Sequence, residues 1–384
     1  MLNIDPKHRV LQIISSAASS GAERHVLDLS IHLVKNGHSV QVVCPNGWLA
    51  EALKVQQIPC HVIEFKKQTY FKSVQMVHRL IKAHQIDIVH SHLVRASHIG
   101  FSASLIARIP LVSSVHVTKA DLFYRISAFF KHQLISVSHY TAMQLEKKGI
   151  SKKQIHVIHN GTDCDGCPKE DSRIIRKKWN IKKEDYLIGI LGYVHPNKGQ
   201  LIAIEALAKV LKEYPNTHLL CIGRFSLEYK SFLDTRIKDL ALGNNVTFTD
   251  NQSNVVPLID ACDFMLMPSA VENLSIAALE IMARKKPIIA SRTGALPEII
   301  QHQKTGLLVE RTLNAFASAI CLLLSKPEQV MQLGQKAFEF VQQNCTNEVM
   351  VQKVEKVYEG SFKRSNSSLS KSEVRIPECT STSC

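Results

Sequence analysis

The sequence has no long hydrophobic run. Its longest apolar stretch, residues 315–324, is half the roughly 20 residues that a membrane-spanning helix needs. The first ten residues also lack the apolar core of a signal peptide. We therefore expect a cytoplasmic protein. If it associates with a membrane, we expect peripheral attachment to the inner face.

Motifs of several common binding proteins are missing as well. The loop after the first apolar segment contains no GxGxxG, so a nicotinamide-binding fingerprint is not supported. None of the signatures of DNA- or RNA-binding modules is present, and we expect no nucleic-acid partner. Cys164 and Cys167 have zinc-like or redox spacing without a second pair nearby, which favours a linker turn. His90 and His92 likewise lack a neighbouring carboxylate or cysteine cluster, so a metal pair is the less favoured interpretation.

Acidic residues are scarce in the first part of the chain. Residues 1–160 carry 19 Lys and Arg against 8 Asp and Glu, a difference of +11, whereas the remainder carries 28 against 25, a difference of +3. An excess of this size favours an anionic partner, such as a phosphate-bearing substrate or an anionic membrane surface.

The chain does contain a regular alternation of short apolar runs and helical periodicity. Helical stretches such as 23–35 and 201–211 separate most of the apolar runs. This alternation predicts an α/β fold with parallel sheets that are covered by helices on both faces. The predicted strands are 10–14, 40–44, 61–65, 86–90, 111–115, 134–137, 155–158, 187–191, 219–222, 246–248, 264–267, 287–290 and 306–309.

A chain of 384 residues is too long for one compact core. We predict two doubly wound, Rossmann-like domains that face a cleft, an N-terminal domain of residues 1–165 and a C-terminal domain of residues 166–345. Residues 346–362 are expected to form a helix that crosses back to the first domain. The polar, Ser-rich residues 363–384 are expected to be disordered.

Two glutamates eight residues apart, Glu272 and Glu280, are the most informative local feature. An apolar strand precedes Glu272, and a helix is expected to begin near Ser275. In open α/β sheets, ligands bind beyond the C-terminal ends of the strands, where helix N-termini offer N–H groups to anions. A carboxylate there can bind sugar hydroxyls through charge-assisted hydrogen bonds. Because the neighbouring residues are mostly apolar, this role is favoured over two solvated surface charges.

Three other residues follow predicted strands. Gly21 lies in a loop of small residues just before a helix, where a ligand can approach the backbone. Lys198 lies between a strand and a helix, where its charge can neutralise a diphosphate. An exposed lysine at the start of a helix, without a ligand, is an equally good interpretation. His116 ends a strand and can donate to a sugar hydroxyl or a phosphate, or simply bond a backbone carbonyl.

Two segments, 66–72 and 119–132, mix aromatic residues with Lys and Arg. As a helix, the second segment places Leu122, Ile126 and Phe129 on one stripe with basic residues on either side. That composition suits an interfacial helix on an anionic bilayer. An ordinary amphipathic helix that packs on its own sheet is the alternative.

Taken together, these segments resemble the retaining glycosyltransferases of family 4, which have the GT-B fold. The resemblance extends from about residue 10 to residue 358, and the block with Glu272 and Glu280 followed by GALPEII is its most specific part. The matching segments, in order, are SGAERHVLDL, IDIVHSH, SVHVTK, VIHNGTD, LGYVHPNKGQ, CDFMLMPSAVENLSIAALEIMA, KKPIIASRTGALPEII and KTGLLV.

The resemblance implies a nucleotide-diphosphate sugar as donor, a cell-envelope glycan or lipid-linked acceptor, and neither a cofactor nor an obligatory metal. Gly21 would lie beside the donor diphosphate and the acceptor, and Lys198 would bind the donor phosphates. The catalytic pair would be His116 and Glu272, which would face the transferred sugar, while Glu280 would hold the ribose hydroxyls. The backbone of Asn273, Leu274 and Ser275 would lie near the sugar and phosphates.

The sequence departs from the family pattern at Tyr193, where an Arg usually stands five residues before the Lys. A phenol cannot replace the charge of a guanidinium, so either Arg24 or Arg224 supplies it, or the donor is held differently, or activity is low. Asn273 also replaces a common Gly. Two alternatives therefore stay open: a nucleotide-sugar epimerase of the same architecture, and a catalytically weak nucleotide-sugar-binding protein.

Overall fold

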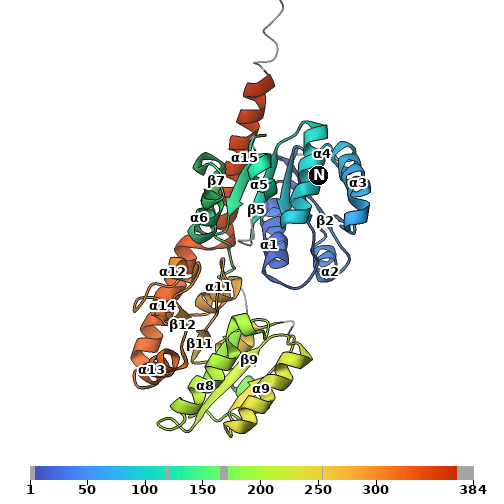
Figure 1. Ribbon diagram of the computed structural model, residues 1–384. Helices are drawn as coiled ribbons and strands as arrows, with labels where there is room; N and C mark the ends of the chain where they lie inside the picture. Colours follow the sequence, from blue (N-terminus) through green and yellow to red (C-terminus); the bar gives the residue numbers. More distant parts are fainter. Residues whose placement is uncertain (1–4, 117–121, 131, 165–171, 253, 370–384) are drawn as a thin grey trace, which may run out of the picture. The chain divides into compact units, whose positions relative to one another are not determined.

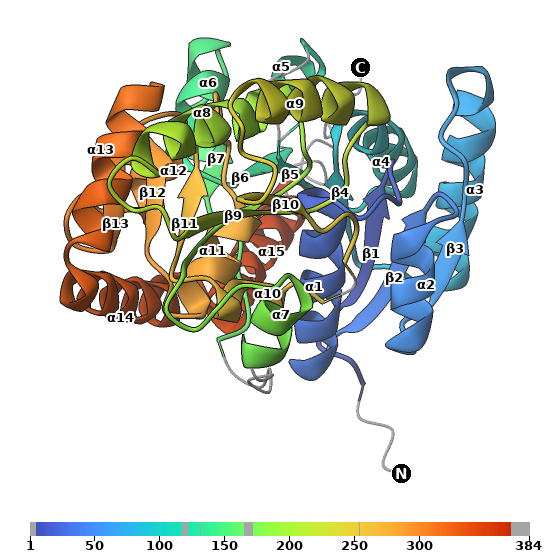
Figure 2. The same ribbon diagram turned by 90° about the horizontal axis from the view of Figure 1, so that it is seen from below.

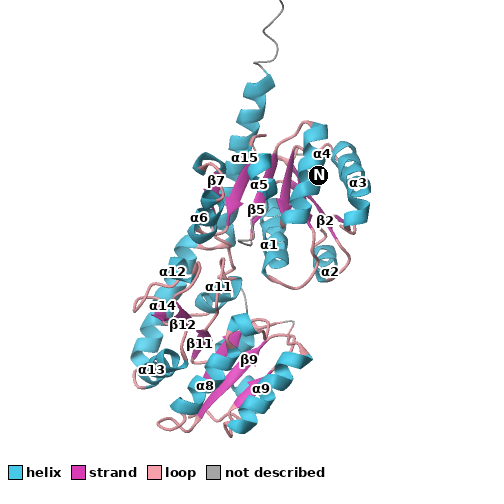
Figure 3. Ribbon diagram, in the orientation of Figure 1, coloured by secondary structure: helices cyan, strands magenta, loops and turns pink. Residues whose placement is uncertain are grey.

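The computed structural model describes residues 5–116, 122–130, 132–164, 172–252 and 254–369. The chain divides into two compact units. The first unit comprises Met1–Val137, Ala142–Ile158 and Val351–Cys384, and the second unit comprises Ser138–Thr141 and His159–Met350. Helices flank the strands of each unit (Figures 1 and 3). Among the described residues, no helix is long and apolar enough to cross a membrane.

The first unit contains a seven-stranded sheet in the order β3-β2-β1-β4-β5-β6-β7, and all of its pairings are parallel. The strands β3, β2, β1 and β4 can be followed side by side in Figure 2. Its strands are β1 (Arg9–Ile14), β2 (Ser39–Cys44), β3 (Cys60–Val62), β4 (Ile88–His92), β5 (Leu111–Val115), β6 (Gln133–Ser136) and β7 (Ile155–Val157).

The second unit contains a six-stranded parallel sheet in the order β10-β9-β8-β11-β12-β13. Its core is formed by strand residues together with apolar faces of the surrounding helices, among them Ala203, Leu207, Phe316 and Ile320. The strands are β8 (Tyr186–Leu191), β9 (Thr217–Ile222), β10 (Val246–Phe248), β11 (Phe264–Met267), β12 (Ile288–Ser291) and β13 (Gly306–Val309). The α/β prediction with two doubly wound, Rossmann-like sheets is confirmed.

Each sheet has a point where the strand order reverses. In the first unit this point lies between β1 and β4, and in the second unit it lies between β8 and β11. Loops that leave the C-terminal ends of such strand pairs form the ligand-binding edge of doubly wound sheets. The loops after β1, β4, β8 and β11 are therefore the segments in which binding residues are expected.

The helices are α1 (Gly21–Lys35), α2 (Trp48–Val55), α3 (Tyr70–Ala83), α4 (Val94–Ala107), α5 (Leu122–Ala128), α6 (His139–Lys147), α7 (Ser172–Lys178), α8 (Gln200–Val210), α9 (Leu227–Asp239), α10 (Val256–Ala261), α11 (Ile276–Ala283), α12 (Leu296–Ile299), α13 (Leu313–Leu324), α14 (Pro327–Asn344) and α15 (Asn347–Leu369). From Val351 onward α15 belongs to the first unit. There the buried Tyr358 hydroxyl lies 2.7 Å from Nδ1 of His90, which ties the helix to β4.

The predicted interfacial helix at 119–132 is shorter than expected. Helix α5 ends at Ala128, because the N–H groups of Phe129 and Phe130 bond the carbonyls three residues back and close the helix in a tight turn. Phe129 therefore follows the helix instead of extending its stripe. Residues 117–121 and 131 of the predicted segment lie outside the described residues.

Candidate functional site

The loops after β8 and β11 bring two sequence-predicted residues into direct contact. Nζ of Lys198, from the loop after β8, lies 2.5 Å from Oε1 of Glu272, from the loop after β11. The hydroxyl of Ser269 donates to the same oxygen at 2.8 Å. Glu272 is only 8% exposed, whereas about a third of the Lys198 side chain remains accessible. A lysine has three N–H donors, so this contact leaves Lys198 able to donate to a further anion.

Two glycines fix the backbone around this ion pair. Gly199 has φ +80°, and a Cβ at this position would lie 2.2 Å from the carbonyl oxygen of Pro268. Gly294 has φ +55°, and a Cβ there would lie 2.1 Å from the carbonyl oxygen of Glu272. That carbonyl instead accepts a 2.8 Å hydrogen bond from the N–H of Ala295. Both positions need glycine because its missing side chain lets two backbone segments approach each other and permits positive φ.

A third residue of this region, Arg311, was not found from the sequence. Its Nε donates to the carbonyl of Pro268 at 2.9 Å, and a terminal nitrogen donates to the carbonyl of Pro196 at 3.3 Å. Arg311 therefore joins the two loops that carry Lys198 and Glu272. No motif marks it, because its partners lie 43 and 115 residues away along the chain.

Helix α11 starts directly after the second loop. The side chain of Ser275 caps it by accepting a 3.3 Å hydrogen bond from the N–H of Ala278. Leu274 is buried, and Glu280 lies half-buried in the second turn of the helix. The side-chain oxygen of Asn273 is buried and has no hydrogen-bond partner in the described part of the chain. A buried oxygen in this state suits a donor from a ligand, such as a sugar hydroxyl.

Tyr193 and Arg224 lie beside each other at the ends of β8 and β9. The N–H of Val194 donates to the carbonyl of Arg224 at 2.8 Å. Tyr193 is 45% exposed and its ring stacks on His195, with 6.0 Å between the ring centroids. The exposed Arg224 can therefore offer a guanidinium next to the position where the family pattern has Arg. Arg24 lies on α1 in the first unit, with its guanidinium 5.3 Å from the ring centroid of Trp48.

In the first unit, Gly21 is the first residue of α1 and His116 directly follows β5. His116 is half-buried and contacts two other histidines. Its Nε2 lies 3.3 Å from Nδ1 of His92, and its ring centroid lies 4.8 Å from that of His25. Burial lowers the pKa of both His92 and His116 well below the ordinary value, and the neighbouring imidazoles lower each pKa further. Both rings are therefore neutral at pH 7.

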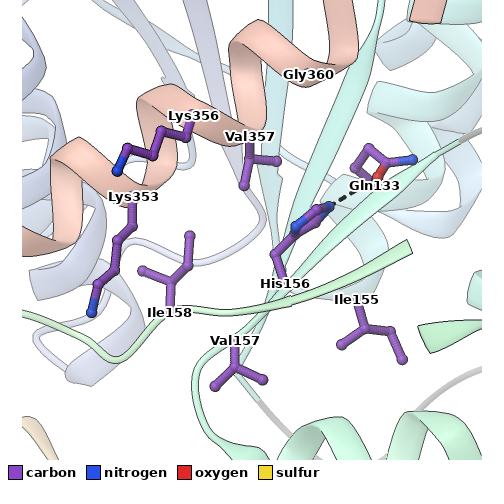
Figure 4. Close-up of a pocket in the computed structure, with 9 residues that line it drawn as sticks. All are labelled: Gln133, Ile155, His156, Val157, Ile158, Lys353, Lys356, Val357 and Gly360. Carbon is purple, nitrogen blue, oxygen red and sulfur yellow. Dashed lines mark hydrogen bonds between the residues drawn. The ribbon is translucent and has the colours of Figure 1, made fainter. Parts of the chain in front are cut away.

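A separate hollow of about 430 Å³ lies in the first unit between the edge strand β7 and α15 (Figure 4). Lys353 and Lys356 come from α15, and His156 on β7 is 2.9 Å from the side-chain oxygen of Gln133. This hollow lies at the sheet edge and not at the strand-order reversal. We therefore do not assign the donor to it.

Comparison with known proteins finds matches to two family models. A model described as "Glycosyl transferases group 1" matches residues 171–340, and a model described as "Glycosyltransferase Family 4" matches residues 19–165. N-acetyl-alpha-D-glucosaminyl L-malate synthase of Bacillus anthracis is 28% identical over 224 residues, which cover 58% of this chain and 58% of that protein. D-inositol 3-phosphate glycosyltransferase of Corynebacterium glutamicum is 25% identical over 283 residues, which cover 66% of this chain and 67% of that protein.

Solved structures share the fold. The crystal structure of Anabaena HepE in complex with UDP-glucose has a TM-score of 0.81 and 22% sequence identity, and the match covers 92% of this chain and 100% of that chain. The GT-B architecture predicted for the two sheets is thereby confirmed.

Proposed function

Since the chain belongs to the glycosyltransferases of group 1 and family 4, we propose that it moves a hexosyl or N-acetylhexosaminyl group from a nucleoside-diphosphate sugar, with retention of configuration. The observation that carries this proposal is the Lys198–Glu272 pair at the strand-order reversal of the second unit. A cation and a carboxylate held side by side can bind a diphosphate and a sugar hydroxyl at the same time.

In the proposed reaction, the acceptor hydroxyl attacks the anomeric carbon while the bond from that carbon to the donor phosphate breaks. The nucleoside diphosphate leaves with the bonding electrons, and the hydroxyl proton departs on the same face, toward the leaving oxygen. Negative charge grows on the diphosphate as the bond breaks. Lys198 stabilises that charge, and the N-termini of α8 and α11 add their helix dipoles.

The carboxylates have separate roles in this proposal. Lys198 and Ser269 both donate to Oε1 of Glu272, so its Oε2 can accept a hydrogen bond from a sugar hydroxyl. The buried side-chain oxygen of Asn273, which has no partner in the described part of the chain, can accept a hydrogen bond from a second hydroxyl. Glu280 binds the two ribose hydroxyls of the nucleotide, and His116 is assigned the contact with the donor sugar or phosphate that the family resemblance implies. No metal is required, because fixed positive charge performs the task of a cation.

For the acceptor we propose an anionic molecule of the cell envelope, a glycan or a lipid-linked sugar. The excess of 19 basic over 8 acidic residues in positions 1–160 supports a negatively charged acceptor. The names of two relatives, N-acetyl-alpha-D-glucosaminyl L-malate synthase and D-inositol 3-phosphate glycosyltransferase, contain the anionic molecules malate and inositol phosphate, which fits the same chemistry.

We further propose that the first unit binds an anionic membrane surface. Ile126, Phe129 and Phe130 are at least half exposed, and Phe130 packs on Phe101 of α4 with 5.3 Å between the ring centroids. On α3, Phe71 is 85% exposed. Exposed aromatic side chains near basic residues suit the interfacial region of a bilayer.

Flotation with liposomes tests the membrane proposal. Phe129→Ser with Phe130→Ser should abolish flotation with anionic liposomes, whereas the matched control Phe232→Ser, at an exposed Phe of the second unit, should not. Flotation that is indifferent to salt or to lipid charge would contradict the proposal.

The transfer itself is tested with a panel of UDP-, GDP- and ADP-sugars. We expect one donor to release nucleoside diphosphate and to transfer its sugar to an anionic acceptor. A changed sugar nucleotide formed from the donor alone would instead indicate an epimerase. Tight binding with neither product would indicate a binding protein.

A further inference from the structure

Three histidines from different elements meet at the strand-order reversal of the first unit. His25 lies on α1 after β1, His92 is the last residue of β4, and His116 follows β5. We call these three residues the histidine cluster. Each offers a ring nitrogen, and the three nitrogen atoms lie within 4.8 Å of one another. His25 and His92 are buried and His116 is half-buried, so the cluster has one accessible side.

The distance within the cluster matches the spacing of metal ligands. Tetrahedral zinc with Zn–N bonds of about 2.0–2.1 Å requires about 3.4 Å between two ligand nitrogens. Nδ1 of His92 and Nε2 of His116 are 3.3 Å apart. The ring centroid of His25 lies 4.8 Å from that of His116 and 5.4 Å from that of His92. Because the ring nitrogens lie within 4.8 Å of one another, a shift of at most about 1.4 Å brings that of His25 to the ligand spacing.

A chain of hydrogen bonds sets the protonation of His92. The hydroxyl of Ser30 donates to the carbonyl of Val26 at 2.7 Å, so its oxygen accepts from the side-chain NH₂ of Gln12 at 2.6 Å. The side-chain oxygen of Gln12 therefore faces Nε2 of His92, 3.0 Å away, and that nitrogen carries the proton. The lone pair of His92 is left on Nδ1, which faces the cluster. Metal-binding histidines are oriented by a second-shell acceptor of this kind.

We propose that His25, His92 and His116 bind one zinc-like divalent cation, with a fourth coordination position open on the accessible side. Three imidazoles suit zinc and the neighbouring transition metals, whereas magnesium and calcium prefer oxygen ligands. The ion takes a ring nitrogen of His116, the residue proposed to contact the donor. Zinc therefore competes with the donor and inhibits transfer; this second consequence rests on the proposed function, while binding of the cation does not.

Cobalt(II), which reports tetrahedral coordination in its visible spectrum, tests the site directly. The full-length protein, freed of metal with a chelator, is titrated with cobalt chloride and then with zinc chloride. We expect one cobalt per chain with tetrahedral bands, displaced by zinc, and no thiolate charge-transfer band. His25→Gln and His116→Gln should each abolish the bands. Gln12→Ala should weaken cobalt binding about 10–100-fold, the usual cost of losing a second-shell partner.

The matched control is His84→Gln, which removes one member of another histidine pair, His61 and His84, with 5.2 Å between the ring centroids. Its cobalt spectrum should equal that of the unchanged protein. Thermal melting shows whether each variant is folded. No tetrahedral spectrum, or one that survives His25→Gln and His116→Gln in folded protein, would overturn the site.

Inhibition is measured separately. Zinc should lower transfer by the unchanged protein, and it should no longer lower the transfer that remains in folded His25→Gln. If no donor in the panel supports transfer, the cobalt titration still decides whether the cation site exists. If transfer occurs and zinc leaves it unchanged despite a cobalt spectrum, the competition with the donor is wrong.

Discussion

At the scale of single residues, Glu272 and Glu280 are distinguished by their surroundings. Glu272 is nearly buried against Lys198 and Ser269 in the loop before α11, whereas Glu280 lies half-buried within the helix. These surroundings fit different parts of one donor molecule. Glu272 suits the sugar, and Glu280 suits the ribose of the nucleotide.

This division predicts different results for the two carboxylates. Glu280→Ala should weaken binding of the nucleoside diphosphate alone about 10–150-fold, since a charged hydrogen bond contributes roughly 1.5–3 kcal/mol. Glu272→Gln should leave nucleoside diphosphate binding within a few-fold and lower transfer. Calorimetric titration measures nucleoside diphosphate binding by each variant, and a donor assay measures transfer. The control is Glu339→Ala on the exposed face of α14. Equal effects of the two variants on nucleoside diphosphate binding would contradict the division.

The substitution at Tyr193 predicts a second residue-scale result. If Arg224 supplies the missing charge, Arg224→Ala should raise the KM for the donor about 10-fold or more, because charged hydrogen bonds are lost. Lys238→Ala, at an exposed lysine of the neighbouring α9, should not change it. Tyr193→Arg should restore affinity in the Arg224→Ala background. If Arg224→Ala behaves like the control, the charge comes from elsewhere.

At the scale of elements, α11 is the helix that carries Glu280, and its start depends on the Ser275 cap. Ser275→Ala should lower the free energy of unfolding by about 1 kcal/mol, within the range of 0.5–2 that such caps show. Thr312→Ala removes a cap of the same geometry from α13, also 3.3 Å from its N–H partner, and should cost a similar amount. Only Ser275→Ala should also weaken donor binding. Urea unfolding measures the stability of both variants, and titration with the donor measures their affinity. Equal donor affinity in the two variants would show that the Ser275 cap does not contribute to the donor site.

The strands of the second unit show what sequence periodicity can predict. Strands β8, β10, β11, β12 and β13 were predicted to within one residue at each end, because apolar runs bounded by turn residues specify buried parallel strands. In the first unit, β3 and β4 are shifted from the prediction. The motif HSH continues β4 beyond the apolar run, since buried histidines replace apolar side chains there.

The contacts around Glu272 show what the sequence could not predict. Ser269, Gly294 and Arg311 act through partners that the fold brings together. Periodicity reports which face of an element is buried, not which distant carbonyl a side chain meets. The tight turn after α5 is a local feature, but helical periodicity continued past Ala128 and gave no sign of the end.

At the scale of the whole molecule, histidines with a lowered pKa lie in the first unit. His90, His92, His116 and His132 all have a pKa lowered mainly by burial, and the pKa of His132 is about 3. The unfolded chain protonates these rings near pH 6.5, whereas the folded chain does so only at lower pH. The unfolded state therefore binds more protons below pH 6.5, and the stability of the first unit should fall from about pH 6.5 down toward pH 3.

The two tryptophans allow this to be measured one unit at a time, because Trp48 lies in the first unit and Trp179 in the second. Trp179→Phe and Trp48→Phe each leave one fluorescent reporter. Between pH 7 and pH 5 the urea midpoint reported by Trp48 should fall more than that reported by Trp179. A larger shift for Trp179, or equal shifts, would contradict the prediction.

The most direct test of the central claim is thermal unfolding in the presence of nucleoside-diphosphate sugars. A donor at 100 times its Kd stabilises the folded state by about 2.7 kcal/mol. We predict that one sugar nucleotide raises the Tm of the unchanged protein, and that the same concentration raises it far less in Glu280→Ala. No rise with any UDP-, GDP- or ADP-sugar, or an equal rise in Glu280→Ala, would contradict the assignment of the donor site to the α11 region.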